Sequence, residues 1–417
     1  MSVLARLAPG RRQAFPRDLR LFVLGQSVSQ IGDQCYLIAL SWLVAQRTGS
    51  PAALGLVLSA AAVPRALLMP FGGALADRLS HRRLLAYVNV GLALLLLALA
   101  GLAGTNAASL WLFAAVAVVV GALEGLLTPA AYSMVPLLVP PETLAQANAL
   151  FLGSVLVSGI VGPLAGGFLL QHAGAALAFG VDSASFLAVA GLLVLMRPVA
   201  ARPADSARPS LVADVRVTAA SIRADGKLAL YMALLLLGNL ALAGPLDVGL
   251  VAMAQSQLHG GPELLGTAMA LFSGGSLLGT LIAGAVGRPA RRLTMLLSGI
   301  LASGAILASV GAASTAPMFL VAAALLGSGI GLIDVLAQTS IQQRAAPDQL
   351  GRVLGVTLCA GKALVPISTA LAGVIAERSV PLLFLAAGAF WMTTTVLLLA
   401  VLRRVREIDG MRASASD

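Results

Sequence analysis

Long apolar stretches alternate with short polar loops along almost the whole chain. Twelve of these stretches hold few or no charged residues over about 20 positions, the length at which an α-helix crosses the hydrocarbon core of a bilayer. The pattern therefore predicts an all-α membrane protein with twelve transmembrane helices. The predicted spans lie near residues 18–45, 52–76, 84–104, 109–137, 145–171, 176–196, 228–252, 263–286, 293–312, 317–340, 351–376 and 380–402.

The composition agrees with this class of protein. Hydrophobic residues make up 59% of the chain and charged residues only 11%, and the mean hydropathy is +0.95. A soluble core cannot bury so much apolar surface, so lipid must solvate the outside of the protein. The arginine-rich start of the chain leads into an apolar run like that of a signal peptide. That run is too long, contains Asp33 and has no clear cleavage site, so we expect it to be retained as the first helix.

Positive charges predict how the helices are oriented. Of the 27 lysine and arginine residues, all but four fall in the N-terminal arm, in alternate loops or in the C-terminal tail. The exceptions are Arg47 and Arg378 in the opposite loops, and Arg65 and Lys362 inside spans. The positive-inside rule then puts both termini in the cytoplasm, and we expect a bacterial inner-membrane protein. This topology explains the net charge of +10, so no nucleic-acid partner is expected.

The longest hydrophilic segment divides the chain in two. Residues 197–227 are rich in Arg, Pro, Ala and Ser and fall between the sixth and seventh spans. Leu211, Val215, Ala219 and Ile222 recur there at helical spacing, which predicts an amphipathic helix at the membrane surface. We expect a six-helix half over residues 1–196, this linker over 197–227, and a second six-helix half with a cytoplasmic tail over 228–417.

The loop after the second span carries the most specific motif. Residues 72–83 form a glycine-led turn that holds one acid and several arginines. The turn resembles the loop between helices 2 and 3 of major facilitator superfamily transporters, although Ser80 and His81 depart from the family pattern. The residues that match it are Gly73, Asp77, Arg78, Arg82 and Arg83. The resemblance implies that this loop gates the cytoplasmic side through contacts between the second and eleventh helices.

A second motif lies in the fifth span. It resembles the fifth-helix motif of major facilitator antiporters at Gly159, Gly162, Pro163, Gly166 and Gly167. Glycines at helical spacing let two backbones approach closely, and the proline invites a bend. Ordinary packing of membrane helices would use the same residue types, but together with the loop motif the resemblance favours an exporter over an importer. Looser similarity to the macrolide-efflux and siderophore-exporter branch runs along essentially the whole chain.

Charged residues inside the predicted spans are candidates for function because the hydrocarbon core penalises charge. They are Asp33, Arg65, Glu124, Asp182, Asp247, Asp334 and Lys362. In the family that the motifs resemble, helices 1, 4, 7 and 10 line the central cavity, which would place Asp33, Glu124, Asp247 and Asp334 around it. Apolar surroundings favour the neutral form of a carboxylic acid, which suits a proton carrier.

The alternative is that these charges form structural ion pairs. Arg65 with Asp33, and Lys362 with Asp334, are the obvious couples between neighbouring helices. We lean toward a functional role for Asp33 and Glu124, leave Asp334 open between the two roles, and expect Asp182 and Asp247 to be structural or at the cavity rim.

The sequence argues against an enzyme. Residues 355–363 resemble a phosphate-binding loop, but the spacing is one residue too long, Ala363 replaces Ser or Thr, and the segment lies within an apolar span. The three histidines are far apart, and the two cysteines lie in predicted spans, so neither a metal site nor a disulfide is indicated. We expect no cofactor.

These features lead to one expected function and two alternatives. We expect a monomeric antiporter that uses alternating access to export a small, largely apolar compound, such as a drug or macrolide, in exchange for protons. A dedicated exporter of a siderophore or other natural product would share the same sequence features. A membrane assembly or signalling protein that has kept the fold and transports nothing is the alternative of another class.

Overall fold

The computed structural model describes residues 15–103, 109–197, 216, 219–220, 225–285, 292–345 and 350–414. All long elements in these ranges are helices. They are α1 (Arg17–Thr48), α2 (Pro51–Leu79), α3 (His81–Ala103), α4 (Leu110–Leu138), α5 (Leu144–Leu195), α7 (Gly226–Gly244), α9 (Pro262–Ala285), α10 (Arg292–Val310), α11 (Ala316–Arg344), α12 (Leu350–Arg378) and α13 (Val380–Ser414). Short helical segments complete the description: η2 (Pro141–Thr143), η3 (Pro245–Gly249), α8 (Leu250–Ala252) and η4 (Met253–Gln257).

The helices match the predicted spans closely. In the described part of the chain, ten are long and apolar enough to cross a membrane. Two differences account for the twelve that the sequence predicts. The backbone turns within α5 at Gly174, where φ is +79°, so this element contains both the fifth and the sixth span. α1 is the least apolar of the long helices because it carries several glutamines and serines together with Asp33. The all-α membrane class is therefore confirmed.

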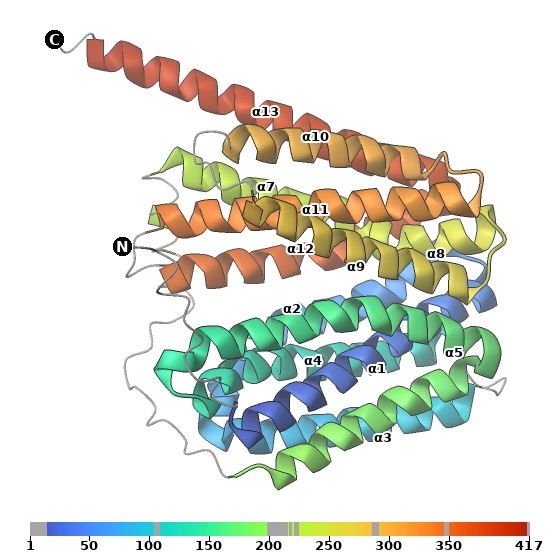
Figure 1. Ribbon diagram of the computed structural model, residues 1–417. Helices are drawn as coiled ribbons and strands as arrows, with labels where there is room; N and C mark the ends of the chain where they lie inside the picture. Colours follow the sequence, from blue (N-terminus) through green and yellow to red (C-terminus); the bar gives the residue numbers. More distant parts are fainter. Residues whose placement is uncertain are drawn as a thin grey trace, which may run out of the picture.

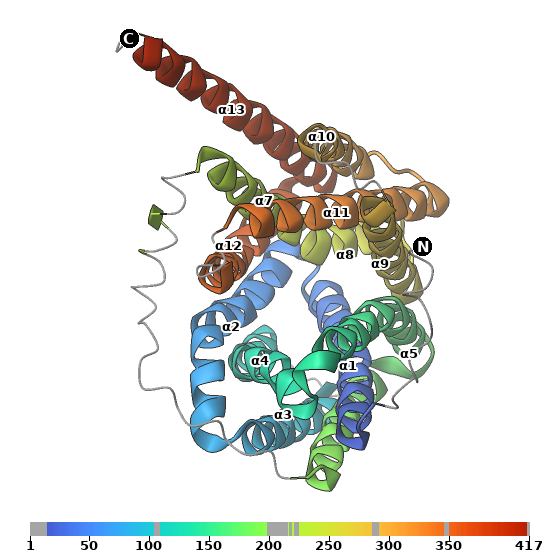
Figure 2. The same ribbon diagram turned by 60° about the vertical axis from the view of Figure 1, so that its left-hand side comes forward.

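Two helical bundles lie side by side (Figure 1). The first contains α1 to α5, in blue to green, and the second contains α7 to α13, in yellow to red. We call them the N-terminal and C-terminal bundles. The domain boundaries given above, 1–196, 197–227 and 228–417, stay a prediction. The predicted amphipathic helix lies almost entirely outside the described residues. α13 projects beyond the other helices in both views (Figures 1 and 2).

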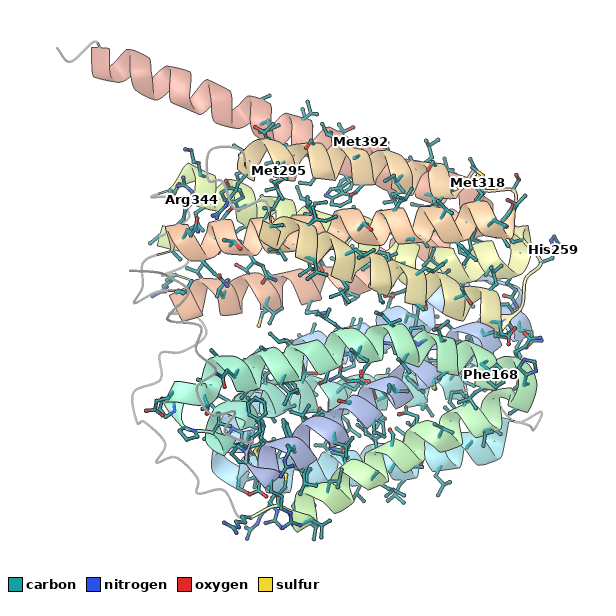
Figure 3. The ribbon with its side chains drawn as sticks, viewed as in Figure 1. Phe168, His259, Met295, Met318, Arg344 and Met392 are labelled. Atoms are coloured by element: carbon teal, nitrogen blue, oxygen red, sulfur yellow. The ribbon has the colours of Figure 1, made fainter. Side chains whose placement is uncertain are left out.

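The helices run between two faces of the molecule. The first face carries the start of α1 and Arg344 at the end of α11, and the second face carries the loop with His259 (Figure 3). Contacts between the bundles are made chiefly by α2 with α12 and by α5 with α9.

Polar caps fix several helix ends. Pro51 follows Ser50, whose hydroxyl accepts a hydrogen bond from the Ala53 N–H at 3.1 Å. A proline at the first helical position and a serine before it are both favoured, because the first amides of a helix have no partner within it. Ser109 caps α4 in the same way, with 3.3 Å from its hydroxyl oxygen to the Leu112 N–H.

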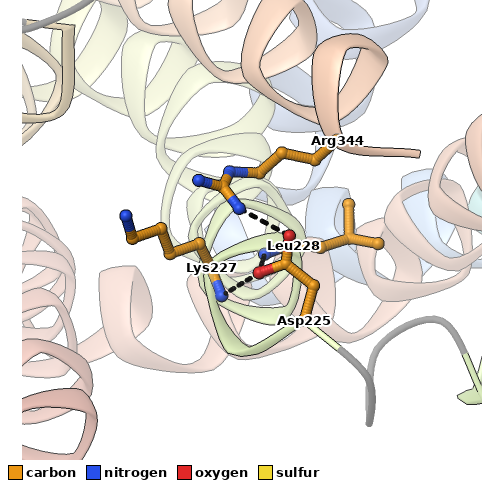
Figure 4. Close-up of polar contacts among 4 residues, drawn as sticks. All are labelled: Asp225, Lys227, Leu228 and Arg344. Carbon is orange, nitrogen blue, oxygen red and sulfur yellow. Dashed lines mark hydrogen bonds and ion pairs between the residues drawn. The ribbon is translucent and has the colours of Figure 1, made fainter. Parts of the chain in front are cut away.

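Asp225 joins the start of α7 to the end of α11 at the first face. Its carboxylate accepts hydrogen bonds from the backbone N–H groups of Lys227 at 2.8 Å and Leu228 at 3.3 Å, and from the Arg344 guanidinium at 2.5 Å (Figure 4). Partial burial acts to raise the pKa of Asp225, but the bonds from Arg344 and the two amides outweigh it, so the pKa lies below its usual value.

Candidate functional site

A cavity of about 620 Å³ lies between the two bundles. Its walls come from α1, α2, α4 and α5 on one side and from α7, η3 and α12 on the other. Apolar residues such as Leu37, Leu58 and Val365 share these walls with polar ones. The polar lining consists of Gln30, Asp33, Gln34, Tyr36, Arg65, Glu124, Ser158, Asn239, Asp247, Lys362 and Thr369. The cavity can therefore hold a largely apolar molecule and still offer it charged partners.

Arg65 and Glu124 form an ion pair across α2 and α4. The Arg65 side chain is 48% exposed, whereas Glu124 is 14% exposed. Gly121 and Gly125 let the helices approach here. A methyl group at Gly121 would collide with the Ala61 carbonyl oxygen, and one at Gly125 would lie 2.7 Å from the Arg65 carbonyl oxygen. The pairing of Arg65 with Asp33 that the sequence suggested is thus wrong: Glu124 lies on the facing turn of a closely packed helix, and no sequence pattern encodes that contact.

Asp33 belongs to a polar stripe on α1. Gln30, Asp33 and Gln34 share one side of this helix and line the cavity, and the apolar Leu37 lines it one turn further on. One oxygen of Asp33, Oδ1, is buried and has no hydrogen-bond partner within the described part of the chain. The placement of Asp33 at the central cavity follows the sequence prediction.

Asp247 reaches the cavity from an irregular segment. It lies in η3, a π-helical turn that begins at Pro245. Proline removes a backbone donor, and an inserted π turn rotates the residues that follow. This turn continues the α7 span, and Asp247 and Leu246 both line the cavity.

A second cavity of about 330 Å³ lies within the C-terminal bundle, between α7, α11 and α12. Asp334, Gln338 and Gln342 follow one another along α11 at intervals of one turn and line it. Asn239 and Lys362 line both cavities. The resemblance implied that Asp334 lines the central cavity. Instead, Asp334 faces this smaller space and is not among the residues that line the central cavity. Lys362 is common to both spaces, and the described residues show no ion pair between it and Asp334.

α2 and α12 bring the bundles together toward the second face. The Glu377 carboxylate accepts hydrogen bonds from the Ser50 hydroxyl at 2.7 Å and the Ala52 N–H at 3.0 Å. A methyl group at Gly55 would lie 2.6 Å from the Thr369 carbonyl oxygen. Ser59, about two and a half turns from the cap, donates to the Pro366 carbonyl at 3.0 Å. These contacts all lie between the midpoint of α2 and its start.

α5 and α9 make a matching contact. His172 and Glu263 approach to 2.8 Å between Nε2 and Oε1. A methyl group at Gly167 would lie 2.7 Å from the carbonyl oxygen of Pro262, so only glycine allows this spacing. The bundles are therefore in direct backbone contact on both sides of the cavity near the second face.

The fifth-span motif contacts two different neighbours. Added methyl groups would lie 2.8 Å from Gln34 Cβ at Gly162 and 3.0 Å from Cys35 Cα at Gly166, so both glycines pack against α1 of their own bundle. Gly167 packs against α9 of the other bundle, and Gly159 would place a methyl 3.5 Å from Ser273 Oγ on α9. Pro163 is buried between them.

The predicted gating loop is described in part. The expected turn over residues 72–83 is wrong in its extent, because α2 continues as a helix to Leu79 and α3 begins at His81. Gly73 therefore lies within α2, and the side chains of Asp77 and Arg78 lie outside the described part of the chain. Arg82 donates to the Val194 carbonyl at 3.0 Å, which ties the start of α3 to the end of α5. The N–H of Arg83 donates to Ser80 Oγ at 3.4 Å.

Several lining residues were not singled out from the sequence. Gln30, Gln34, Tyr36 and Asn239 are uncharged, so a search for intramembrane charge passes over them. Their spacing from Asp33 on α1 is a signal that could have found the first three. The contact of Glu377 with Ser50 gave no such signal, because the residues lie 327 positions apart.

Comparison with known proteins agrees with this architecture. The profile of the Major Facilitator Superfamily matches residues 22–367 and 248–414. Among solved structures, the nucleoside transporter NupG superposes with a TM-score of 0.71 at 12% identity, covering 92% of this chain and 99% of NupG. PepTSo, a transporter of the POT family, has the same TM-score and identity, with 94% and 99% covered. At this identity the likeness shows the fold alone.

Curated relatives are similar over nearly their full length. Macrolide efflux protein A of Streptococcus pyogenes is 24% identical, covering 85% of this chain and 88% of the relative. The multidrug efflux pump Tap of Mycobacterium tuberculosis is 26% identical, covering 93% and 94%. YfiS of Bacillus subtilis, an uncharacterized MFS-type transporter, is 27% identical, covering 89% and 90%. The chain belongs to the major facilitator superfamily and is a multi-pass secondary transporter of small molecules, not an enzyme.

Proposed function

We propose that this transporter exports small, largely apolar compounds in exchange for protons. The observation that carries the proposal is the common depth of three charged residues. Asp33, Arg65 and Glu124 each lie at the midpoint of their helix, α1, α2 and α4, and each lines the cavity between the bundles. A helix rises about 1.5 Å per residue, so the charges lie roughly 20 Å from either face. Charge at this depth is costly and marks a functional site by default.

Orientation follows from the positive-inside rule, which assigns the first face to the cytoplasm of a bacterial inner membrane. The bundle contacts near the second face, such as Glu377 with Ser50, would then close the external side. The cavity would be reached from the cytoplasm, where an exporter collects its substrate. Rocking of one bundle against the other would expose the same residues to the outside.

Proton exchange would take place at the carboxylates. Glu124 has Arg65 as its ion-pair partner, and this cation balances a carboxylate charge at mid-membrane. Asp33 has an unpaired buried oxygen, and such a group is far cheaper to keep in its neutral form. We therefore assign the exchanged proton first to Asp33, with Glu124 as its release partner when Arg65 moves.

The gating loop has a separate proposed role. Asp77 and the surrounding arginines would hold the cytoplasmic side closed when the external side opens, through α2 and α12. This role rests on the loop's resemblance to its counterpart in the family. The contact between Arg82 and Val194 within the N-terminal bundle would keep the loop close to the ends of α3 and α5.

The relatives support export without fixing the substrate. Two of them are named for macrolide or multidrug efflux, and the cavity mixes apolar walls with acidic groups that would attract a cationic, lipophilic compound. A dedicated exporter of one natural product would use the same cavity. A protein that transports nothing would have no need for charges at the midpoint of three helices.

The test uses purified protein in liposomes. With an imposed proton gradient, we expect accumulation of radiolabelled erythromycin or ethidium and proton movement when either is added. Glu124→Gln and Asp33→Asn should retain substrate binding and lose gradient-driven accumulation, whereas Glu142→Gln, an exposed acid in η2, is the matched control. Proton movement with only one natural product from a panel would support the dedicated exporter. Absence of substrate-dependent proton movement across the panel would contradict proton antiport.

A further inference from the structure

A second buried carboxylate, Asp182, packs against α1 at Gly32, the residue before Asp33. It belongs to the part of α5 that follows Gly174, and only 1% of its surface is exposed. It is not among the residues that line the central cavity. The Ser185 hydroxyl donates to Asp182 Oδ1 at 3.1 Å and to its backbone carbonyl at 2.7 Å. The other carboxylate oxygen, Oδ2, has no hydrogen-bond partner within the described part of the chain.

Gly32 brings Asp182 against α1. A methyl group at Gly32 would collide with Asp182 Oδ1 and would lie 2.5 Å from Ser185 Oγ. Because Asp33 is the next residue, the absence of a side chain at Gly32 brings the Asp182 carboxyl group to the turn of α1 that carries Asp33. A third unpaired polar atom, the Tyr36 hydroxyl, lies one turn further along α1.

Within the described part of the chain, no cation forms an ion pair with Asp33 or Asp182. The charged groups close enough to act on Asp182 are Asp33 and Glu124, which are both acids. Arg65 is close enough to act on Asp33, but it is already paired with Glu124. The remaining titratable groups that face the cluster are Cys35 and Tyr36, both on α1. Two carboxylates without a cation of their own cannot both be ionised in buried surroundings except at a high energetic cost.

We infer that Asp33 and Asp182 form one acid pair that holds the exchanged proton, with Asp33 as its cavity-facing member and Asp182 as its buried donor. This deepens the proposed proton-coupled export and rests on it. With both acids protonated, the pair is neutral. When a cationic substrate enters, Asp33 releases one proton to the cavity, and the remaining proton on Asp182 is shared with the Asp33 carboxylate. The pair then carries one negative charge, which balances the released proton.

The geometry explains why a second acid is needed. An isolated Asp33 carboxylate would be left at mid-membrane with a buried oxygen that accepts no hydrogen bond. A protonated Asp182 would supply an O–H donor for it through Oδ2, which has no other partner within the described part of the chain, while Ser185 holds Oδ1 in position. Two titratable groups that share a proton titrate as a unit. The number of protons exchanged for each substrate molecule would therefore depend on both acids.

Infrared difference spectroscopy tests the pair without any substrate. Purified protein is titrated, and the carbonyl stretching bands of protonated carboxylic acids are followed. We expect Asp33→Asn to remove one band and shift the band of Asp182, and Asp182→Asn to remove the Asp182 band and shift that of Asp33. Ser185→Ala should shift the Asp182 band and, through the pair, that of Asp33. Bands that disappear singly and leave the others unmoved would overturn the proposal, as would a spectrum in which neither substitution removes a band.

Two glycine variants provide a matched comparison on the same helix contact. Gly32→Ala should displace Asp182 and shift both bands. Gly25→Ala lies two turns earlier, where an added methyl would lie 3.3 Å from the Leu192 side chain and 3.6 Å from that of Val189, and should leave both bands in place. Equal effects of the two variants would contradict the pair.

Transport measurements separate this inference from the proposed function. In liposomes, Asp182→Asn should lower the number of protons moved per ethidium by about half or more while ethidium still binds. If wild-type protein moves no protons but the reciprocal band shifts are present, the acid pair stands and proton antiport fails. If wild-type exchange is intact and the bands are independent, antiport stands and the pair fails.

Discussion

The carboxylate of Glu377, near the end of α12, accepts a hydrogen bond from the Ser50 hydroxyl, which caps the start of α2, at 2.7 Å. It also accepts from the Ala52 N–H at 3.0 Å. An acid of the C-terminal bundle thus caps a helix of the N-terminal bundle, and a negative charge at a helix N-terminus is favourable. This cap is one of the few polar links between the bundles in the described residues, so it bears on how easily they separate.

Glu377→Ala should make the second face open more often. A charge at a helix N-terminus contributes about 0.3–1 kcal/mol, which corresponds to a roughly two- to five-fold change in the populations. The measurement is the rate at which an impermeant maleimide labels Ala62→Cys, in the cavity wall, when it is added from the second face. Cys35 and Cys359 are replaced in this background. Glu142→Gln is the control, and an unchanged labelling rate in Glu377→Ala would contradict a role for the cap.

Gly167→Ala should weaken the other contact between the bundles. The added methyl would lie 2.7 Å from the Pro262 carbonyl oxygen on α9, so α5 and α9 must separate. We expect at least a several-fold change in the same labelling rate. Gly153→Ala on the same helix meets no atom within 4 Å and should behave like the wild type. If the two variants label alike, the contact does not control the equilibrium.

Helix positions were predictable because each depends on local sequence. The apolar runs and the break near Gly174, between the predicted spans 145–171 and 176–196, follow from residues close together in the chain. The residues that a side chain contacts on another helix were not predictable in the same way, because they depend on how the helices pack. Arg65 could reach Asp33 or Glu124, and the choice depends on Gly125, which lets α4 approach α2. Asp334 was assigned to the central cavity by its helix, but its position on that helix turns it toward the smaller space.

Asp225→Asn should lower thermal stability at neutral pH, because the cap of α7 and the bond to Arg344 are weakened. Asparagine can still accept the two amide hydrogen bonds, so the loss comes mainly from the negative charge at the helix N-terminus, which contributes about 0.3–1 kcal/mol. The pKa of Asp225 in the folded protein lies below the unfolded value of 3.8, so its stabilising effect is complete above pH 3.8 and declines as pH falls through the folded value.

The difference in melting temperature between Asp225→Asn and wild type should therefore shrink when detergent-solubilised protein is compared at pH 7 and at the lowest pH at which it stays folded. Arg344→Gln should reduce the effect of Asp225→Asn when the two are combined, since they share one bond. A difference that grows on acidification would mean that the sign of the Asp225 contribution is wrong.

Removing one partner of the ion pair between Arg65 and Glu124 should lower thermal stability more than removing both partners together. Glu124→Gln leaves Arg65 without its carboxylate, and Arg65 is 48% exposed to the cavity, so water tempers the loss to on the order of 1 kcal/mol. The freed guanidinium would then attract Asp33 and hold it ionised, which removes a proton carrier. We expect Glu124→Gln to bind ethidium and lose gradient-driven transport.

Arg65→Gln combined with Glu124→Gln should recover thermal stability without recovering transport, because Asp33 is then free to hold its proton but has no release partner. Full transport in the double variant would show that the pair is structural and that proton exchange proceeds without it.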